Sequence, residues 1–249
     1  MIKKNILFIY PSMIIGGSTT ALLSFMNSLD SKKYNIDLQL LRNEGPLLDA
    51  IPKSVNLLPP AEVYSGIKGR IIKLLICFFK GYFLKALYRG ATSHKGSLIS
   101  RPVLTEFQAR ELSRKNDKIY DYAIGFLEGW SNRYLAFCIN ANHKYAWLHS
   151  TFENITAVPA LEIPWMKNVD KIIFVTDSCR NAFIKTMPEM NYKTITIENI
   201  TDNDIILNRS LLIDEKDEAL NRFASSQKFK IITVCRLQIA TKGLDRIVS

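Results

Sequence analysis

Two cations flank a loop near the end of the chain, in a pattern that suits an anionic ligand. Arg236 comes directly after an apolar run at residues 230–235, and Lys242 follows six residues later, before a second apolar stretch. This order is typical of a strand, a polar loop and a helix start, whose free N–H groups favour anions. Arg236 and Lys242 are therefore predicted to clamp a diphosphate.

A histidine and a glutamate each follow an apolar run in the middle of the chain. His149 comes after residues 144–148, and Glu128 comes shortly after residues 122–126. A lone histidine is more often structural, but a place beside a polar turn at a strand end favours a catalytic role for His149. We expect Glu128 either to hold a sugar hydroxyl or a cationic group, or to stabilise the following helix through its dipole.

A glycine pair follows the first apolar run. Gly16 and Gly17 come after residues 5–10 and before an apolar-periodic stretch that predicts a helix over residues 21–29. Adjacent glycines let a backbone approach a ligand closely, although a plain tight turn explains them equally well. The spacing does not match the GxGxxG fingerprint, which disfavours a nicotinamide cofactor.

The elements that must position these residues are short apolar runs separated by helical patterns. Such runs lack alternation of polarity and suit strands buried on both faces of a parallel sheet. The fold class is therefore predicted as α/β, a doubly wound, Rossmann-like parallel sheet. Polar residues at 18–20 and 176–178 are the expected helix N-caps. The predicted strands are residues 5–10, 35–41, 122–126, 144–148, 171–175 and 230–235.

Most of the net charge of +10 comes from one segment, residues 63–105, which contains eight Lys and Arg residues and no Asp or Glu. Its apolar residues repeat at helical spacing, which predicts an amphipathic helix. That helix either lies on an anionic membrane or packs in the core with a solvated basic face. Nucleic acid is disfavoured, because the aromatic residues follow helical periodicity. The predicted membrane-binding residues are Arg70, Lys73, Lys80 and Lys85.

The four cysteines lie far apart and form no CxxC pair, which predicts reduced thiols and no metal site. The first apolar stretch is interrupted by Pro11 and is read as a buried strand instead of a signal peptide. The longest apolar run of the basic segment is far shorter than the ~20 residues that span a bilayer. We therefore expect a cytoplasmic protein, peripheral on the inner face of the cell membrane.

Together these motifs resemble glycosyltransferase family 4, whose retaining GT-B enzymes use nucleotide-diphosphate sugars. The resemblance rests on Gly16 and Gly17, on residues 147–149, 174–178 and 198–202, and on the motif at residues 236–245. It implies acceptor-side roles for Gly16, Gly17 and Glu128, a catalytic role for His149, and donor diphosphate binding by Arg236 and Lys242. It also implies no metal and no separate cofactor, with a glycan or lipid-linked acceptor in bacterial cell-surface polysaccharide or glycolipid synthesis.

A polar, acidic stretch at residues 201–218 interrupts the pattern of strands and helices before a new strand begins. With the resemblance, this predicts an acceptor-binding domain at residues 1–200, a linker at 201–228 and the start of a donor-binding domain at 229–249. Family members continue with a whole donor domain, so the expectation is a truncated enzyme that is inactive alone. Two alternatives stay open. One is a GT-B-fold nucleotide-sugar epimerase, and the other is a non-catalytic module that docks on a membrane or binds an acceptor.

Overall fold

The computed structural model describes residues 2–64, 66–91, 101–152, 159–203, 207 and 218–230. The chain separates into two compact units, Met1–Asp202 and Asn203–Ser249. In the second unit, helix α10 (Glu218–Ser225) lies within the stretch predicted as a linker. The strand predicted at residues 230–235 extends beyond the described residues, and Arg236 and Lys242 lie outside them. The predicted domain boundaries therefore stay predictions.

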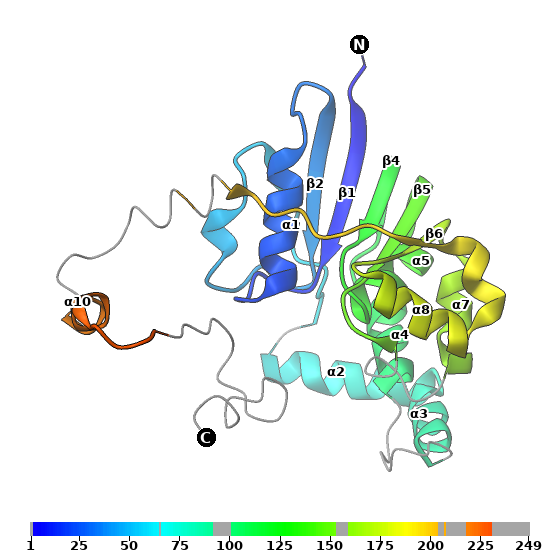
Figure 1. Ribbon diagram of the computed structural model, residues 1–249. Coiled ribbons are helices and arrows are strands. Elements are labelled where there is room, and N and C mark those ends of the chain that lie inside the picture. The colour runs from blue at the N-terminus through cyan, green and yellow to red at the C-terminus, as the bar shows by residue number, and fades with distance from the viewer. Residues whose placement is uncertain are drawn as a thin grey trace. The chain divides into compact units, whose positions relative to one another are not determined.

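The first unit is built on a seven-stranded sheet whose neighbouring strands are all parallel, in the order β3-β2-β1-β4-β5-β6-β7 (Figure 1). The predicted α/β class is confirmed. Five of the predicted strands are present, while β3 and β7, each three residues long, have no counterpart in the prediction. The strands are β1 (Lys4–Tyr10), β2 (Tyr34–Leu40), β3 (Val55–Leu57), β4 (Asn116–Gly125), β5 (Ile139–Leu148), β6 (Lys171–Phe174) and β7 (Thr194–Thr196).

Helices cover both faces of this sheet (Figure 1). On one face α1 packs against alternate residues of β1, such as Phe8. On the other face α5 packs against the residues between them, such as Leu7 and Ile9, and residues of α4, α7 and α8 belong to the same hydrophobic core. The helices are α1 (Gly17–Ser28), α2 (Gly66–Phe79), α3 (Tyr82–Ala91), α4 (Arg101–Glu111), α5 (Trp130–Cys138), α7 (Ile163–Lys167) and α8 (Asp177–Thr186), with 3-10 turns at Leu48–Ala50, Pro159–Leu161 and Pro188–Lys193.

The two predicted helix starts differ. Helix α8 begins as expected, because the Thr176 hydroxyl accepts a hydrogen bond from the backbone N–H of Cys179. Helix α1 begins earlier than predicted, at Gly17, and its N-cap Gly16 offers no side chain. The expected capping hydroxyls of Ser18 and Thr19 instead bond the Tyr10 hydroxyl, at 2.8 and 3.1 Å. The first turn of α1 therefore has no side-chain cap.

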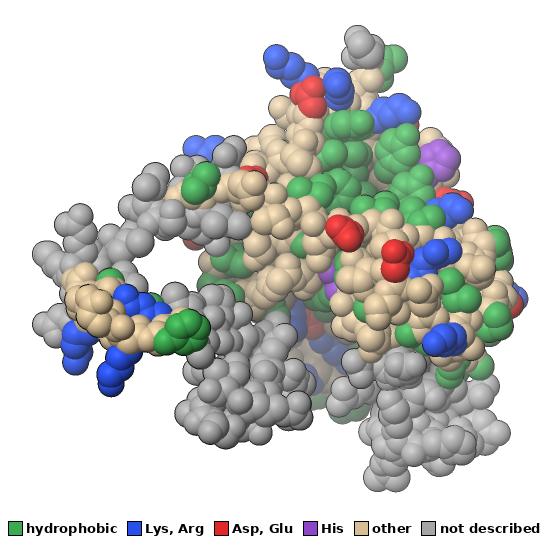
Figure 2. Space-filling model, in the orientation of Figure 1, with side chains coloured by type: hydrophobic (Ala, Val, Ile, Leu, Met, Phe, Trp, Pro, Cys, Tyr) green, Lys and Arg blue, Asp and Glu red, His purple; other side chains and the backbone are tan. Residues whose placement is uncertain are grey.

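The chain returns to α1 after the last strand. Beyond β7 it crosses the face that carries α1 (Figure 1), and the Asp202 carboxylate accepts a bond of 2.6 Å from the Asn27 side chain. On the same face, the rings of Tyr122, His143 and Tyr145 stack along β4 and β5. Hydrophobic side chains gather over these strands in Figure 2, where none of the described helices covers them.

The amphipathic helix predicted in the basic segment is divided into two helices, α2 and α3. Helix α2 ends at Phe79, and Gly81 has a φ of 70°, a left-handed conformation that glycine adopts without strain. Helix α3 then starts at Tyr82, whose ring packs 4.8 Å from that of Phe107 in α4. None of the described helices is both long and apolar enough to cross a bilayer.

Candidate functional site

The strand order creates a switch point beside β1. The chain passes from β1 through α1 to β2 on one side, and later enters β4 on the other side of β1. In open parallel sheets of this kind, ligands bind at the carboxyl ends of the strands next to such a point. Gly16 follows β1, Glu128 follows β4 and His149 follows β5, so the fold brings these three predicted residues to that edge.

Glu128 joins the loop after β4 to the loop after β5. One carboxylate oxygen, Oε2, accepts a bond of 3.0 Å from the backbone N–H of His149, and Oε1 accepts one of 2.6 Å from the Ser150 hydroxyl. Its charge also raises the pKa of His149. Both oxygens therefore already have a protein partner, and the geometry gives Glu128 a positioning role beside any contact with a ligand.

The His149 ring packs against Phe126, with centroids 4.9 Å apart. A hydrogen bond with the Phe126 backbone raises the pKa of the imidazole. The Phe126 N–H already donates to Ile9, so the Phe126 carbonyl is the group left to accept from the ring. His149 Nε2 is buried and has no hydrogen-bond partner among the described residues, which makes it the ring nitrogen open to a ligand.

Burial keeps this imidazole neutral. Desolvation lowers the pKa of His149 below its usual 6.5, and this effect outweighs the opposing influences of Glu128 and the Phe126 carbonyl. A neutral ring with a bare Nε2 is an acceptor for a hydroxyl proton. Nε2 is closed off from solvent in this structure.

Further polar atoms without partners lie at the start of α5, directly after Glu128. They are Ser131 Oγ, Asn132 Oδ1 and Arg133 Nε, all buried. Asn132 also ties α5 to β5, because its Nδ2 donates to the Trp147 carbonyl at 3.0 Å. A Cβ at Gly125 would lie 2.4 Å from Asn132 Oδ1, so glycine is what allows this close approach. Unpartnered buried groups are costly, so each of these atoms calls for a partner such as a water molecule or a ligand atom.

A buried ion pair supports the same helix start. Arg133 donates to both oxygens of Glu162, at 2.8 and 2.7 Å, and the Trp165 indole donates to Glu162 Oε2 at 2.6 Å. Arg133 also donates to the backbone carbonyl of Gly129, the residue that separates Glu128 from α5. The pair thereby holds the turn that positions Glu128.

The glycine pair does not form a left-handed turn. Gly16 has an extended backbone with a φ of 175°, which any residue adopts, so backbone strain does not explain this glycine. A Cβ at Gly17 would meet nothing within 4 Å. The loop therefore leaves open space beside the uncapped first turn of α1, and its acceptor role stays a prediction.

Two of the predicted membrane-binding residues contact carboxylates of the protein itself. Lys73 pairs with Glu62, and Lys80 lies 3.5 Å from Glu111. Lys85 lies over the ring of Tyr82 at 5.9 Å, and Arg70 is exposed. The prediction placed all four cations on the side of the helix opposite its apolar face, whereas the structure directs Lys73 and Lys80 toward the protein.

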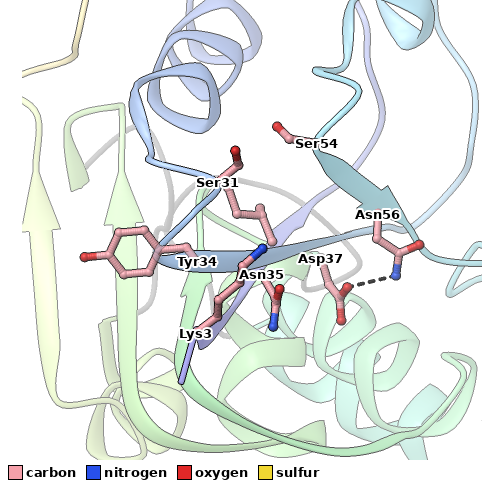
Figure 3. Close-up of a pocket in the computed structure, with 8 residues that line it drawn as sticks. Lys3, Ser31, Tyr34, Asn35, Asp37, Ser54 and Asn56 are labelled. Carbon is pink, nitrogen blue, oxygen red and sulfur yellow. Dashed lines mark hydrogen bonds between the residues drawn. The ribbon is translucent and has the colours of Figure 1, made fainter. Parts of the chain in front are cut away.

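The opposite, amino edge of the sheet has a polar depression of about 290 Å³ at the ends of β1, β2 and β3 (Figure 3). Asp37 lines it, but the Asp37 carboxylate accepts bonds from Asn56, Lys118 and Tyr120. Burial raises the pKa of Asp37, and these three bonds together hold it below its usual value. The carboxylate is thus committed to structure, at the edge away from the predicted site.

Sequence reasoning missed several residues that build this site. Arg133 and Glu162 lie 29 positions apart, and nothing in their local sequence pairs them. Ser150 is a detectable omission, because it directly follows His149 in the polar turn that drew attention to the histidine. Among the described residues, no group of three or more His, Cys, Asp and Glu side chains is placed to hold a metal ion.

Comparison with known proteins gives a faint likeness. No family model matches the chain, and neither does any curated protein sequence. Among solved structures, UGT2 of Phytolacca americana, complexed with UDP-2-fluoro-glucose and pterostilbene, is 13% identical with a TM-score of 0.33. The match covers 83% of this chain and 57% of the Phytolacca americana protein, so this chain spans little more than half the length of that protein. This likeness carries no argument about function.

Proposed function

We propose that this chain acts in transferring a sugar from a nucleotide-diphosphate sugar to an acceptor hydroxyl, as a glycosyltransferase of the retaining GT-B type resembling family 4. The observation that carries the proposal is the unpartnered Nε2 of His149, beside Glu128 at the carboxyl edge of the sheet. A neutral acceptor atom shielded from water suits recognition of a hydroxyl, which is the reacting group of a sugar acceptor.

His149 and Glu128 divide the work at this site. Nε2 receives a hydroxyl of the acceptor or of the transferring sugar, because it is the buried ring nitrogen without a partner among the described residues. Glu128 holds the His149 backbone in place and favours any positive charge that develops on the ring. General-base assistance of this kind contributes about 10²–10⁴-fold to a rate.

Arg236 and Lys242 complete the proposal on the donor side. They neutralise the charge that builds on the leaving diphosphate while the bond from the sugar carbon to the phosphate oxygen breaks. The proposed reaction uses neither a metal nor a separate cofactor. We further propose a cytoplasmic, peripheral membrane location and a glycan or lipid-linked acceptor of cell-surface polysaccharide or glycolipid synthesis.

A transfer assay tests the proposal. The protein is incubated with a panel of radiolabelled nucleotide-diphosphate sugars and with octyl glycosides as soluble acceptors. Each incubation is run with and without a separate family 4 donor-binding domain, because the resemblance implies that the chain is inactive without one, and the label in the glycoside is counted. We expect incorporation from at least one donor, reduced about 10²-fold by His149→Ala. Arg236→Ala and Lys242→Ala should each reduce it comparably.

Glu189→Gln is the matched control, because Glu189 is an exposed carboxylate in the 3-10 turn at Pro188–Lys193 and lies outside the motifs of the resemblance. That variant should keep the rate of the unmodified chain. Consumption of the donor without any acceptor would favour the epimerase alternative. Absence of both reactions with every donor would contradict the proposal.

A further inference from the structure

Helix α2 contacts the rest of its unit through one narrow stripe. Cys77 is buried against Phe107 and Leu112, and Ile76 packs beside it. At Gly69, a Cβ would lie 2.7 Å from the backbone of Tyr64, so this side of α2 touches the chain itself. Spacings of seven and eight residues place Gly69, Ile76 and Cys77 on one side of a helix. The orientation of α2 is thereby set.

The opposite side of α2 is apolar and exposed. Its members follow the spacing i, i+3, i+4, i+7, which makes one continuous stripe on a helix. We call this set the outward stripe: Ile71, Leu74, Leu75 and Phe78, with exposed fractions of 55, 69, 52 and 68%. A helix that packs on a protein and faces water normally shows the reverse pattern, with polar residues outward.

The charges around α2 are arranged for an anionic partner. Lys73 and Lys80 lie on the protein side and pair with Glu62 and Glu111. At about 100° per residue, Lys68 and Arg70 flank the outward stripe on its two sides, and both are exposed. Since residues 63–105 contain no Asp or Glu, no acidic side chain of this segment offsets the two flanking cations.

We propose that α2 lies flat in the headgroup region of an anionic lipid bilayer, with the outward stripe inserted and with Lys68 and Arg70 at the headgroups. A convex apolar stripe bordered by cations matches this surface, which offers acyl chains next to negative charge. The inference deepens the proposed membrane partner and is independent of the proposed transferase activity. Lys68 and Arg70, instead of Lys73 and Lys80, are then the principal cationic contacts with lipid.

The docking places the candidate site toward the lipid. Just before α2, Glu62 bonds Leu41, the residue after β2, and in Figure 1 α2 lies beyond the carboxyl ends of the strands. His149 and Glu128 lie at that same edge. A lipid-linked acceptor would therefore approach the site from the membrane.

Vesicle flotation tests the proposal. The full chain is floated with vesicles of phosphatidylcholine and phosphatidylglycerol at 7:3, and with phosphatidylcholine alone. We expect flotation with the anionic vesicles, and a loss of partitioning of about 10-fold or more for Leu74→Ser/Phe78→Ser. Lys68→Gln/Arg70→Gln should reduce flotation on anionic vesicles about 10-fold. Lys73→Gln/Lys80→Gln should retain most of the flotation with the anionic vesicles.

Ile119→Ser is the matched control, because Ile119 in β4 is an exposed apolar residue, at 68%, away from α2. It should float like the unmodified chain. Thermal unfolding checks that each variant folds, which is expected because every replaced residue of the outward stripe is exposed. Transfer to a soluble octyl glycoside should be unchanged in Leu74→Ser/Phe78→Ser, which separates failure of docking from failure of the transferase proposal.

Two results would overturn the inference. Equal flotation of Leu74→Ser/Phe78→Ser and the unmodified chain would show that the stripe does not contact lipid. Absence of flotation of the unmodified chain would also show that the stripe does not contact lipid. Light scattering would then show whether a second copy of the chain covers the stripe. A monomer would leave a different protein as the partner.

Discussion

The ion pair between Arg133 and Glu162 offers a sharp test of how the candidate site is held together. The two side chains are 3 and 1% exposed and meet through two bonds of 2.8 and 2.7 Å. Glu162→Gln keeps the size of the side chain and removes the charge. Arg133 then stays buried with only the Gly129 carbonyl as a certain partner, and Trp165 loses its charged acceptor.

The expected cost follows from that burial. Removing one partner of a buried ion pair lowers the free energy of unfolding by about 3–5 kcal/mol, because the other charge stays desolvated. Arg133→Met/Glu162→Gln removes both charges, so most of the loss should be recovered. An exposed ion pair would cost at most about 1 kcal/mol.

Urea unfolding followed by tryptophan fluorescence measures this difference through the unfolding midpoint. Glu189→Gln is again the control and should leave the midpoint unchanged. A loss below about 1 kcal/mol for Glu162→Gln, or a double variant as unstable as the single one, would refute the buried pair as the support of the α5 start.

The remaining predictions concern the same edge of the sheet. The pKa of His149, followed by NMR, should lie below 6.5 and fall further in Glu128→Gln, since the carboxylate raises it. His149 binds a proton more tightly in the unfolded state than in the folded state, where its pKa is lowered. The stability gained from burying a neutral His149 is therefore present above about pH 6.5, and it is lost as the pH falls through that value. Gly125→Ala should destabilise the fold by about 1–3 kcal/mol through the clash with Asn132, whereas Gly17→Ala should change stability by less than about 0.5 kcal/mol, as urea unfolding will show.

Much of the fold could be predicted from the sequence, because the central strands are continuous apolar runs. Such runs mark β1, β2, β4, β5 and β6, and the parallel α/β class follows from the helical patterns between them. The edge strands β3 and β7 are too short to leave this signal. Helix α1 starts earlier than predicted because Ser18 and Thr19 bond Tyr10 instead of capping the helix.

The candidate site was only partly predictable, for a physical reason. A residue that follows a parallel strand must lie at the carboxyl edge, so His149 and Glu128 could be found from strand ends alone. The partners that orient them come from distant segments, as Glu162 does for Arg133. The orientation of Lys73 was likewise missed, because helical periodicity defines an apolar face but does not say which side meets the protein.

The most direct test of the central claim follows the His149 ring itself. Long-range proton–nitrogen NMR on histidine-labelled protein reports Nε2 and Nδ1 separately while UDP-glucose, other nucleotide-diphosphate sugars and octyl glycosides are added. The expectation is that a sugar ligand shifts the His149 Nε2 resonance strongly as Nε2 accepts a hydroxyl. Saturating binding of such a ligand with an unchanged Nε2 resonance would contradict it.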